Sequence, residues 1–301
     1  MFQFEFESNN VVESKESIIQ PTKLYAVEQL LECLPETISY AMCNGIPRRE
    51  WWDVKHQLMS DDSFSSDEKD ILLGTNDLLT NRYEGGLKTW ECALDLVTYI
   101  RDQPCPANVL ELGCGAALPS MACLLNCLRQ PDKSGAKRSF MLADFNESVL
   151  KLVTMPNLLL TCISAEGPNL MDDVGSICVA DECTRLLDIL ERHSIQVTFL
   201  SGSWSEDMAR LLSNTYELIL ASETIYSMSS LQPFTKLVCD AMAPTGKAVI
   251  ASKQIYFGVG GGVAEFASCA ERHGLLCRRV KSTSNGISRV ILESTFCGHP
   301  N

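Results

Sequence analysis

The segment Asn108–Pro119 constrains the fold more than any other part of this chain, because it predicts a strand, a glycine turn and a helix start. Its first five residues are mostly apolar and include one carboxylate, Glu111, as in a central strand of a parallel sheet. Gly113 and Gly115 allow a sharp turn with close approach of a ligand, and Pro119 suits a first helical turn. In α/β sheets such a turn is the usual binding place of a nucleotide-like ligand.

The spacing of these glycines excludes two common nucleotide motifs. A dinucleotide fingerprint needs a further glycine where Leu118 stands, and the chain contains no P-loop sequence. An acidic strand residue followed by Gly-x-Gly instead resembles motif I of seven-strand, S-adenosylmethionine-dependent methyltransferases. A chance pair of glycines at a strand end is the alternative that this segment alone leaves open.

The charge of the chain argues against direct contact with nucleic acid, which needs a basic surface. The net charge is −13, and residues 1–86 hold 16 acidic against 7 basic side chains. This acidic region suits either a solvated leader or the docking of a basic protein. We expect no membrane contact, since no apolar run is long enough to span a bilayer and the first ten residues lack the basic region of a signal peptide.

The cysteine pattern indicates reduced thiols in an intracellular protein. The chain has 14 cysteines without a Cys-x-x-Cys pair, and none of its 4 histidines lies at zinc-ligand spacing from a cysteine pair. We therefore expect no metal site. We expect a cytoplasmic monomer, with nuclear entry left open because no basic cluster stands out.

Two regions are predicted along the chain. Residues 1–75 form an acidic extension, partly flexible, with a helix over Pro21–Tyr40 where leucine and valine recur every three or four residues. Ser60–Asp70 has the composition of a linker. Residues 76–301 form the second region, which its resemblance to motif I of methyltransferases implies to be a methyltransferase domain.

In this second region strand and helix patterns alternate, which predicts a doubly wound, Rossmann-like α/β sheet. Leu275–Lys281 and Arg289–Ser294 predict a closing antiparallel hairpin that turns at Asn285 and Gly286. The connection 164–192 is expected to be helical in its second half. Strands are expected at residues 108–112, 139–144, 197–200, 216–221 and 247–252, and the main helices at 92–101, 118–129, 146–160, 231–242 and 262–273.

Four strand ends carry side chains suited to one ligand, because the carboxyl ends of parallel strands share an edge. Asp144 can accept both hydroxyls of a ribose, although an acid is also favoured at a helix N-terminus. Trp204 could stack on an adenine. The other candidates are Gly113 and Gly115 under a methionine moiety, Gly202 and Ser203 near the adenine, and Ser222 and Glu223 beside the methyl donor.

Five short motifs then resemble one family in order and spacing. They are Leu87-Lys-Thr-Trp-Glu91, Glu111-Leu-Gly-Cys-Gly115, Asp144-Phe-Asn146, Gly202-Ser-Trp204 and Ser222-Glu-Thr-Ile-Tyr226. Together they resemble the eukaryotic protein-histidine N-methyltransferases of the methyltransferase-like family 16 superfamily, which modify a histidine of a large-subunit ribosomal protein. The resemblance covers about residues 76–295.

This resemblance implies S-adenosylmethionine as cofactor and a basic ribosomal protein as substrate. It implies that Trp90 forms part of the cofactor-binding wall rather than of the core. Ala117 and Ser120 depart from the family pattern of motif I, but these changes add little bulk to the pocket. The cofactor contacts that it implies are Thr89, Trp90, Glu91, Cys92, Ala93, the motif I residues Glu111, Gly113 and Gly115, then Asp144, Phe145, Asn146, Gly202, Ser203, Trp204 and Ser222.

Glu223 is the expected catalytic residue, because a carboxylate can hold one ring nitrogen of histidine and turn the other toward the methyl group. Its alternative is to structure the loop. Tyr226 would wall the acceptor slot or pack in the core, and Lys253–Phe257 would line the substrate side. Two other functions remain open: a lysine methyltransferase, since Glu-x-x-Tyr is shared with lysine-modifying relatives, and a non-catalytic protein that holds a basic client.

Overall fold

The protein is built around a central, mostly parallel sheet. This computed structural model describes residues 19–74, 82–130, 136–166, 172–212, 215–256, 260–283 and 286–298. Within these residues eight strands form the sheet in the order β1-β7-β5-β4-β8-β9-β11-β10. Only β1 and β11 run antiparallel to the rest, so the predicted doubly wound sheet with a closing hairpin is confirmed. The strands are β1 (Lys23–Ala26), β4 (Asn108–Leu112), β5 (Arg138–Asp144), β7 (Ile195–Ser201), β8 (Tyr216–Ser222), β9 (Met242–Lys253), β10 (Leu275–Thr283) and β11 (Arg289–Phe296).

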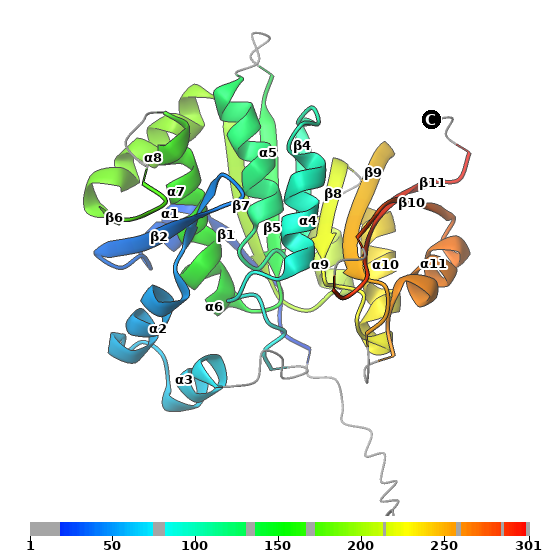
Figure 1. Cartoon of the computed structure of the whole chain (residues 1–301), viewed down its shortest axis with the longest axis horizontal. Coiled ribbons are helices and arrows are strands. Elements are labelled where there is room, and N and C mark those ends of the chain that lie inside the picture. Colours follow the sequence, from blue (N-terminus) through cyan, green and yellow to red (C-terminus); the bar gives the residue numbers. More distant parts are fainter. Residues whose placement is uncertain are drawn as a thin grey trace, which may run out of the picture.

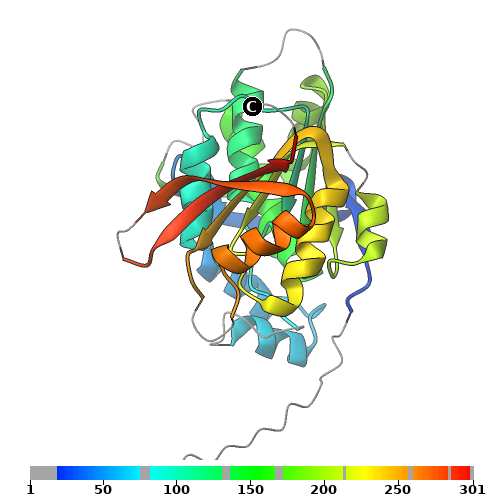
Figure 2. The ribbon, with the colours of Figure 1, turned by 90° about the vertical axis from the view of Figure 1, so that its right-hand side faces the viewer.

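Helices cover both faces of this sheet (Figure 1), and each face has its own buried apolar cluster. Figure 2 looks onto the edge formed by β10 and β11, where the twisted hairpin crosses beside α10 and α11. One face carries α4 (Glu91–Ile100), α5 (Leu118–Arg129) and α8 (Ala180–Arg192). It also carries one continuous helix made of three consecutive elements, α6 (Glu147–Val149), η1 (Leu150–Thr154) and α7 (Met155–Ala165). The other carries α9 (Glu206–Leu211), α10 (Met228–Ala241) and α11 (Val263–Arg272).

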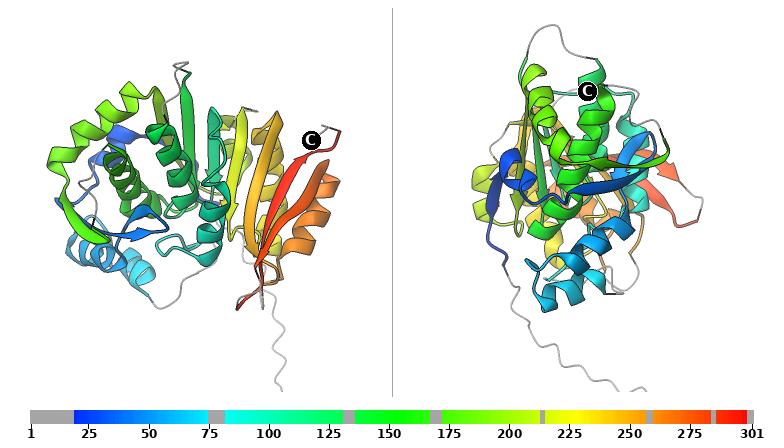
Figure 3. Two further views of the ribbon diagram at one scale, coloured as in Figure 1. Left: turned by 45° about the horizontal axis from the view of Figure 1, so that its top comes forward. Right: turned by 90° about the vertical axis from the view of Figure 1, so that its left-hand side faces the viewer.

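The N-terminal elements form a second layer over α7, seen from its outer side in the right-hand view of Figure 3. A small antiparallel sheet there has the order β3-β2-β6. Its strands are β2 (Thr37–Cys43), β3 (Ile46–Arg49) and β6 (Val174–Cys178), and the accompanying helices are α1 (Val27–Leu31), α2 (Trp51–Ser60) and α3 (Ser66–Leu73). The division at residue 75 stays a prediction, but β1 belongs to the main sheet rather than to a separate extension.

The helix predicted over Pro21–Tyr40 is wrong. Lys23–Ala26 is a strand, only Val27–Leu31 is helical, and Thr37–Cys43 is again a strand. The helical spacing of apolar residues is overridden because β1 finds hydrogen-bonding partners on the open edge of β7. The expectation of a flexible start concerns residues 1–18, which lie outside the described residues.

The helical second half expected for the connection 164–192 is confirmed as α8, and its first half contains strand β6, which pairs with β2. Two further expectations need correction. The predicted linker Ser60–Asp70 instead includes the start of α3, where the side chains of Ser65 and Glu68 form a capping box. The sequence pattern predicts no apolar run long enough to span a bilayer, but the helix Glu147–Ala165, with a mean hydropathy of 1.4, has the length and composition to do so. In this protein 78% of its apolar window is buried, as in a core helix.

Arg49 anchors the N-terminal layer to the main domain. Its side chain is 1% exposed, and its Nε donates to Asp53 Oδ2 at 2.6 Å. A terminal guanidinium nitrogen donates at 2.8 Å to Gln57 Oε1 and to the carbonyl oxygen of Leu152. That carbonyl belongs to the π-helical turn η1, so the irregular turn and the buried cation satisfy each other.

Asp53→Ala is expected to lower the free energy of unfolding by about 3–5 kcal/mol, because it leaves the Arg49 guanidinium buried without its counter-charge. Urea unfolding followed by circular dichroism measures the change. Asp207→Ala is the control, since it removes an exposed ion pair with Arg210, and it should leave the midpoint unchanged. An effect of Asp53→Ala as small as that of the control would show that Gln57 and Leu152 suffice to hold Arg49.

Candidate active site

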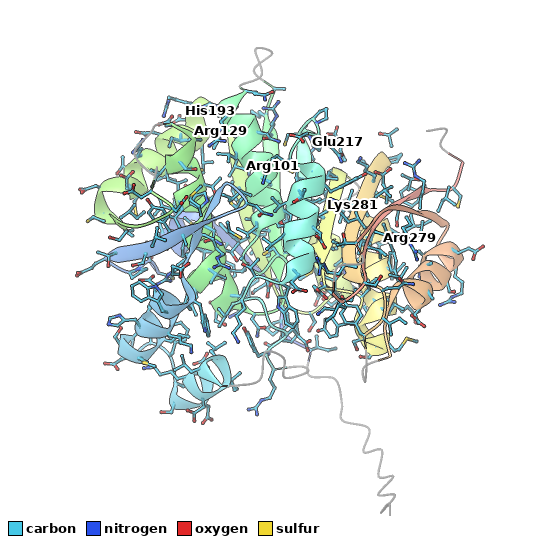
Figure 4. The ribbon with its side chains drawn as sticks, viewed as in Figure 1. Arg101, Arg129, His193, Glu217, Arg279 and Lys281 are labelled. Atoms are coloured by element: carbon cyan, nitrogen blue, oxygen red, sulfur yellow. The ribbon has the colours of Figure 1, made fainter. Side chains whose placement is uncertain are left out.

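A cavity of about 480 Å³ lies where the central strands of the main sheet end, and the carboxyl ends of β4, β5, β7 and β8 surround it. In Figure 4 the labelled side chains of Arg101 and Glu217 mark the opposite edge, where β4 and β8 begin. The structure brings most of the predicted site residues to this cavity: Thr89, Trp90, Ala93, Gly113, Gly115, Asp144, Phe145, Gly202, Ser203, Trp204, Ser222, Glu223 and Tyr226 all line it.

The turn after β4 is shaped by close backbone contacts that only glycine permits. Gly113 has φ +64°, and a Cβ there would lie 2.8 Å from the Cγ2 atom of Thr224. Gly115 has φ +51°, and its Cβ would lie 3.1 Å from the Cα atom of Gly86. Ala117, one of the departures from the family motif, also adopts a left-handed backbone, with φ +52°. The backbone at Gly113 and Gly115 therefore packs directly against neighbouring segments of the cavity wall.

Asp144 is a buried hydrogen-bond acceptor at the end of β5. Its Oδ2 accepts the N–H of Gly115 at 2.8 Å, and its Oδ1 accepts the N–H of Asn146 at 3.0 Å. Burial raises the pKa of Asp144 to about 6, while these backbone donors oppose that rise. Because each carboxylate oxygen can accept more than one hydrogen bond, Asp144 still has capacity for hydroxyl donors in the cavity.

The N-terminal segment closes the cavity beside β7. Ser203 Oγ accepts the N–H of Gln20 at 2.8 Å, and Ser203 N–H donates to the carbonyl oxygen of Gln20 at 3.2 Å. The ring of Trp204 lies 4.9 Å from the ring of Phe234 in α10, centroid to centroid. Trp204 is thus fixed on one side by the core while it also lines the cavity.

Glu223 presents a carboxylate to the cavity directly after β8. Its backbone is left-handed, with φ +56°, and its N–H donates to the carbonyl oxygen of Ala251 at 2.9 Å. The side chain is 9% exposed. The hydroxyl of Tyr256 donates to Oε2, whereas Oε1 has no hydrogen-bond partner among the described residues and lies 3.6 Å from Lys253 Nζ. Oε1 is therefore a buried acceptor that lacks a hydrogen-bond donor in this part of the structure.

A second carboxylate, Glu84, also lines the cavity and accepts a hydrogen bond from the Tyr226 hydroxyl. Burial, followed by the charge of Glu84, raises the pKa of Tyr226 well above its ordinary value. Burial and the charge of Glu223 do the same for Tyr256. Both phenols therefore stay protonated and act as donors, and their rings meet edge to face with centroids 6.2 Å apart.

Four of the predicted cofactor residues lie away from the cavity wall: Glu91, Cys92, Glu111 and Asn146. Glu111 is buried beneath the glycine turn, where its Oε2 accepts the N–H of Ser120 at 2.9 Å and burial raises its pKa to about 8. Asn146 binds the loop before α4, since its Oδ1 accepts the N–H of Glu84 and its Nδ2 donates to the carbonyl oxygen of Arg82. Cys92 is buried beside Glu223, and Glu91 faces Arg289.

Glu84 also matters to this geometry, and it was missed because no spacing in the sequence distinguishes it from a surface acid. Of the segment Lys253–Phe257, expected to line the substrate side, Lys253 and Tyr256 line the cavity, Gln254 and Ile255 do not, and Phe257 lies outside the described residues.

Comparisons with known proteins point in one direction. No family model matches the chain. It is 42% identical over 289 residues, 89% of this chain and 84% of the relative, to histidine protein methyltransferase 1 of Schizosaccharomyces pombe. The Saccharomyces cerevisiae protein of the same name is 37% identical, covering 73% of this chain and 67% of the relative. A homologue from Bos taurus is 32% identical, over 73% of this chain and 58% of the relative.

Among solved structures, the chain is similar to a TehB-like SAM-dependent methyltransferase from Corynebacterium glutamicum. The sequence identity is 15%, the TM-score is 0.41, and the alignment covers 69% of this chain and 89% of the other.

Asp144→Asn is expected to weaken binding of S-adenosylmethionine about tenfold or more, because the charged acceptor for hydroxyl donors is lost. In the unmodified protein, affinity should be full above about pH 7. It should fall as the pH drops through about 6, since a proton then occupies the acceptor. Titration calorimetry from pH 5 to 8 measures both effects.

The matched control is Asp240→Asn, which removes an exposed carboxylate paired with Lys236 on α10. Its affinity and pH profile should equal those of the unmodified protein. Equal affinity of Asp144→Asn and the control at pH 7.5 would contradict the assignment of Asp144 as a ligand acceptor.

Proposed function

This chain belongs to the histidine protein methyltransferase family, and from that premise we propose that it methylates a histidine of a large-subunit ribosomal protein in the cavity beside Glu223. The observation that carries the assignment of the site is the buried Oε1 of Glu223, an acceptor without a hydrogen-bond partner among the described residues. The net charge of −13 supports a basic protein as substrate.

The residues of the cavity fit S-adenosylmethionine. Gly113 and Gly115 line the cavity without a side chain, Asp144 offers a buried acceptor for ribose hydroxyls, and Trp204 offers an aromatic wall near the end of β7. Thr89, Trp90 and Ser222 complete the wall on the side of Glu223. When bound, S-adenosylmethionine supplies a methyl group on a sulfonium, an electrophile that needs no acid catalyst.

Glu223 orients the acceptor. Its Oε1 accepts the N–H of a neutral imidazole, which fixes the ring and turns the lone pair of the other nitrogen toward the methyl carbon. A histidine side chain has a reference pKa of about 6.5 and is mostly neutral near pH 7, so the lone pair is available without a general base. As the N–C bond forms, the ring becomes an imidazolium, and the carboxylate stabilises this positive charge.

The two tyrosines shape the slot rather than move protons. Tyr256 donates to Glu223 Oε2 and leaves the buried Oε1 without a hydrogen-bond donor among the described residues. Tyr226 donates to Glu84, lines the same cavity and packs its ring against that of Tyr256. Because the pKa of each phenol is raised, neither serves as a base near neutral pH.

Transfer of a labelled methyl group tests the proposal. The purified protein and labelled S-adenosylmethionine are added to ribosomal proteins from cells that lack this enzyme, and the labelled band is hydrolysed for amino-acid analysis. Label in methylhistidine of one large-subunit protein is the expected result. Label in methylhistidine of other proteins only would refute the ribosomal substrate, and label in methyllysine alone would refute the acceptor.

Glu223→Gln is expected to bind S-adenosylmethionine nearly as the unmodified protein does, and to lower kcat about 10²-fold or more, because the charge that orients and stabilises the ring is lost. Single-turnover methyl transfer and calorimetry measure the two quantities separately. Glu217→Gln, at the opposite end of the same strand, is the control and should keep full activity. An unchanged kcat for Glu223→Gln would make Glu223 structural only.

A further inference from the structure

The side chain of Lys253, at the end of β9, places a positive charge inside the acceptor slot. Its ammonium lies 4.7 Å from the ring centroid of Trp90, 5.7 Å from that of Tyr256 and 3.6 Å from Oε1 of Glu223. The side chain is only 16% exposed. A cation thus already occupies the aromatic and anionic surroundings beside Glu223 that would attract a cationic acceptor.

The other charges of the cavity are engaged elsewhere. Glu84 accepts the hydroxyl of Tyr226, and Asp144 accepts two backbone N–H groups. Lys88 also lines the cavity, but its ammonium lies 5.8 Å from the ring centroid of Trp51 in α2. Among the charged side chains lining the cavity in the described part of the chain, Glu223 is therefore the carboxylate that Lys253 faces, and the two form one electrostatic unit.

We propose that Lys253 is a specificity-determining residue that makes the slot select histidine over lysine; this rests on the proposed function. The ammonium of an incoming lysine would meet a like charge a few ångströms away and a carboxylate that is already paired. A neutral imidazole meets no such repulsion, and its N–H can share Glu223 Oε1 with Lys253, because a carboxylate oxygen accepts more than one donor.

The two acceptors differ in their proton requirement. Imidazole uses an existing lone pair to form the N–C bond while the carbon–sulfur bond breaks and its electron pair stays on sulfur. The imidazolium then releases its N–H proton to water. A lysine amine must first lose a proton to water before its nitrogen can attack the methyl carbon. A neighbouring cation favours the loss of that proton, but it opposes entry of the protonated lysine, which is the form that predominates near pH 7.

The test compares amino-acid products of three variants. Lys253→Met and Lys253→Gln remove the charge, and Lys253→Arg keeps it. Each is incubated with labelled S-adenosylmethionine and total protein from cells that lack this enzyme, and the ratio of methyllysine to methylhistidine is measured. We expect this ratio to rise tenfold or more in Lys253→Met and Lys253→Gln and to stay at the unmodified level in Lys253→Arg.

The matched control is Lys55→Met, because Lys55 also lies over a tryptophan, 5.3 Å from the ring centroid of Trp51, but outside the cavity. It should change neither total activity nor the ratio. An unchanged ratio in both neutral variants would overturn the proposal. Where Lys253→Met does not fold, Lys253→Gln decides, and a folded, cofactor-binding Lys253→Gln that labels neither amino acid would also overturn it, since Lys253 would then be needed for transfer itself.

Failure of the selection proposal is distinguishable from failure of the proposed function. If the unmodified protein places no label in methylhistidine, the function is wrong whatever the variants do. If it labels methylhistidine and the neutral variants keep the same ratio, only the role of Lys253 is refuted. A rise of methyllysine with pH from 7 to 9 in the neutral variants is a further expected result, because the acceptor amine must lose its proton.

Discussion

A single buried carboxylate, that of Asp144, joins the elements from which the cavity is made. Its two oxygens hold the backbone of Gly115 in the turn after β4 and of Asn146 at the start of the next helix, and its own carbonyl oxygen accepts the N–H of Gly202 after β7. Asn146 in turn holds the backbone of Glu84, and Glu84 holds Tyr226. The desolvation of the Asp144 carboxylate is thus offset by backbone donors, and the same network holds the backbone of Glu84, a second carboxylate that lines the cavity.

The central sheet could be predicted from the sequence because its strands are buried on both faces and read as continuous apolar runs between turn residues. The elements before α4, together with β6, could not be predicted in this way. Lys23–Ala26 has no strand pattern of its own and becomes a strand because the edge of β7 is open to it. Val174–Cys178 pairs with β2, more than 130 residues away in sequence, and such a long-range partner leaves no local signal. The sequence contains the residues of the capping box at Ser65, but the polar composition around them favoured the interpretation as a linker over that of a helix.

The candidate site divides in the same way. Residues at strand ends, such as Asp144 and Glu223, were predictable because parallel strands bring their carboxyl ends to one edge. Glu111 stands at the carboxyl end of β4, yet its side chain lies beneath the glycine turn and accepts a backbone N–H there. No sequence pattern distinguishes an acidic residue that lines a cavity from one that supports the cavity from beneath. Glu84 and Lys253 act through pairs, with Tyr226 and Glu223, that only the fold brings together.

The backbone pairing of Gln20 with Ser203 has a practical consequence for handling the protein. Gly202 makes room for this pairing, since a Cβ there would lie 2.7 Å from the carbonyl oxygen of Pro21. The described part of the chain therefore begins at the cavity, which Ile19 itself lines. Strand β11 runs antiparallel to β9 and ends at the opposite edge of the sheet, toward the end marked C in Figure 1. Affinity tags, surface tethers and fluorescent fusions attached at that end leave the cavity mouth open to a protein substrate.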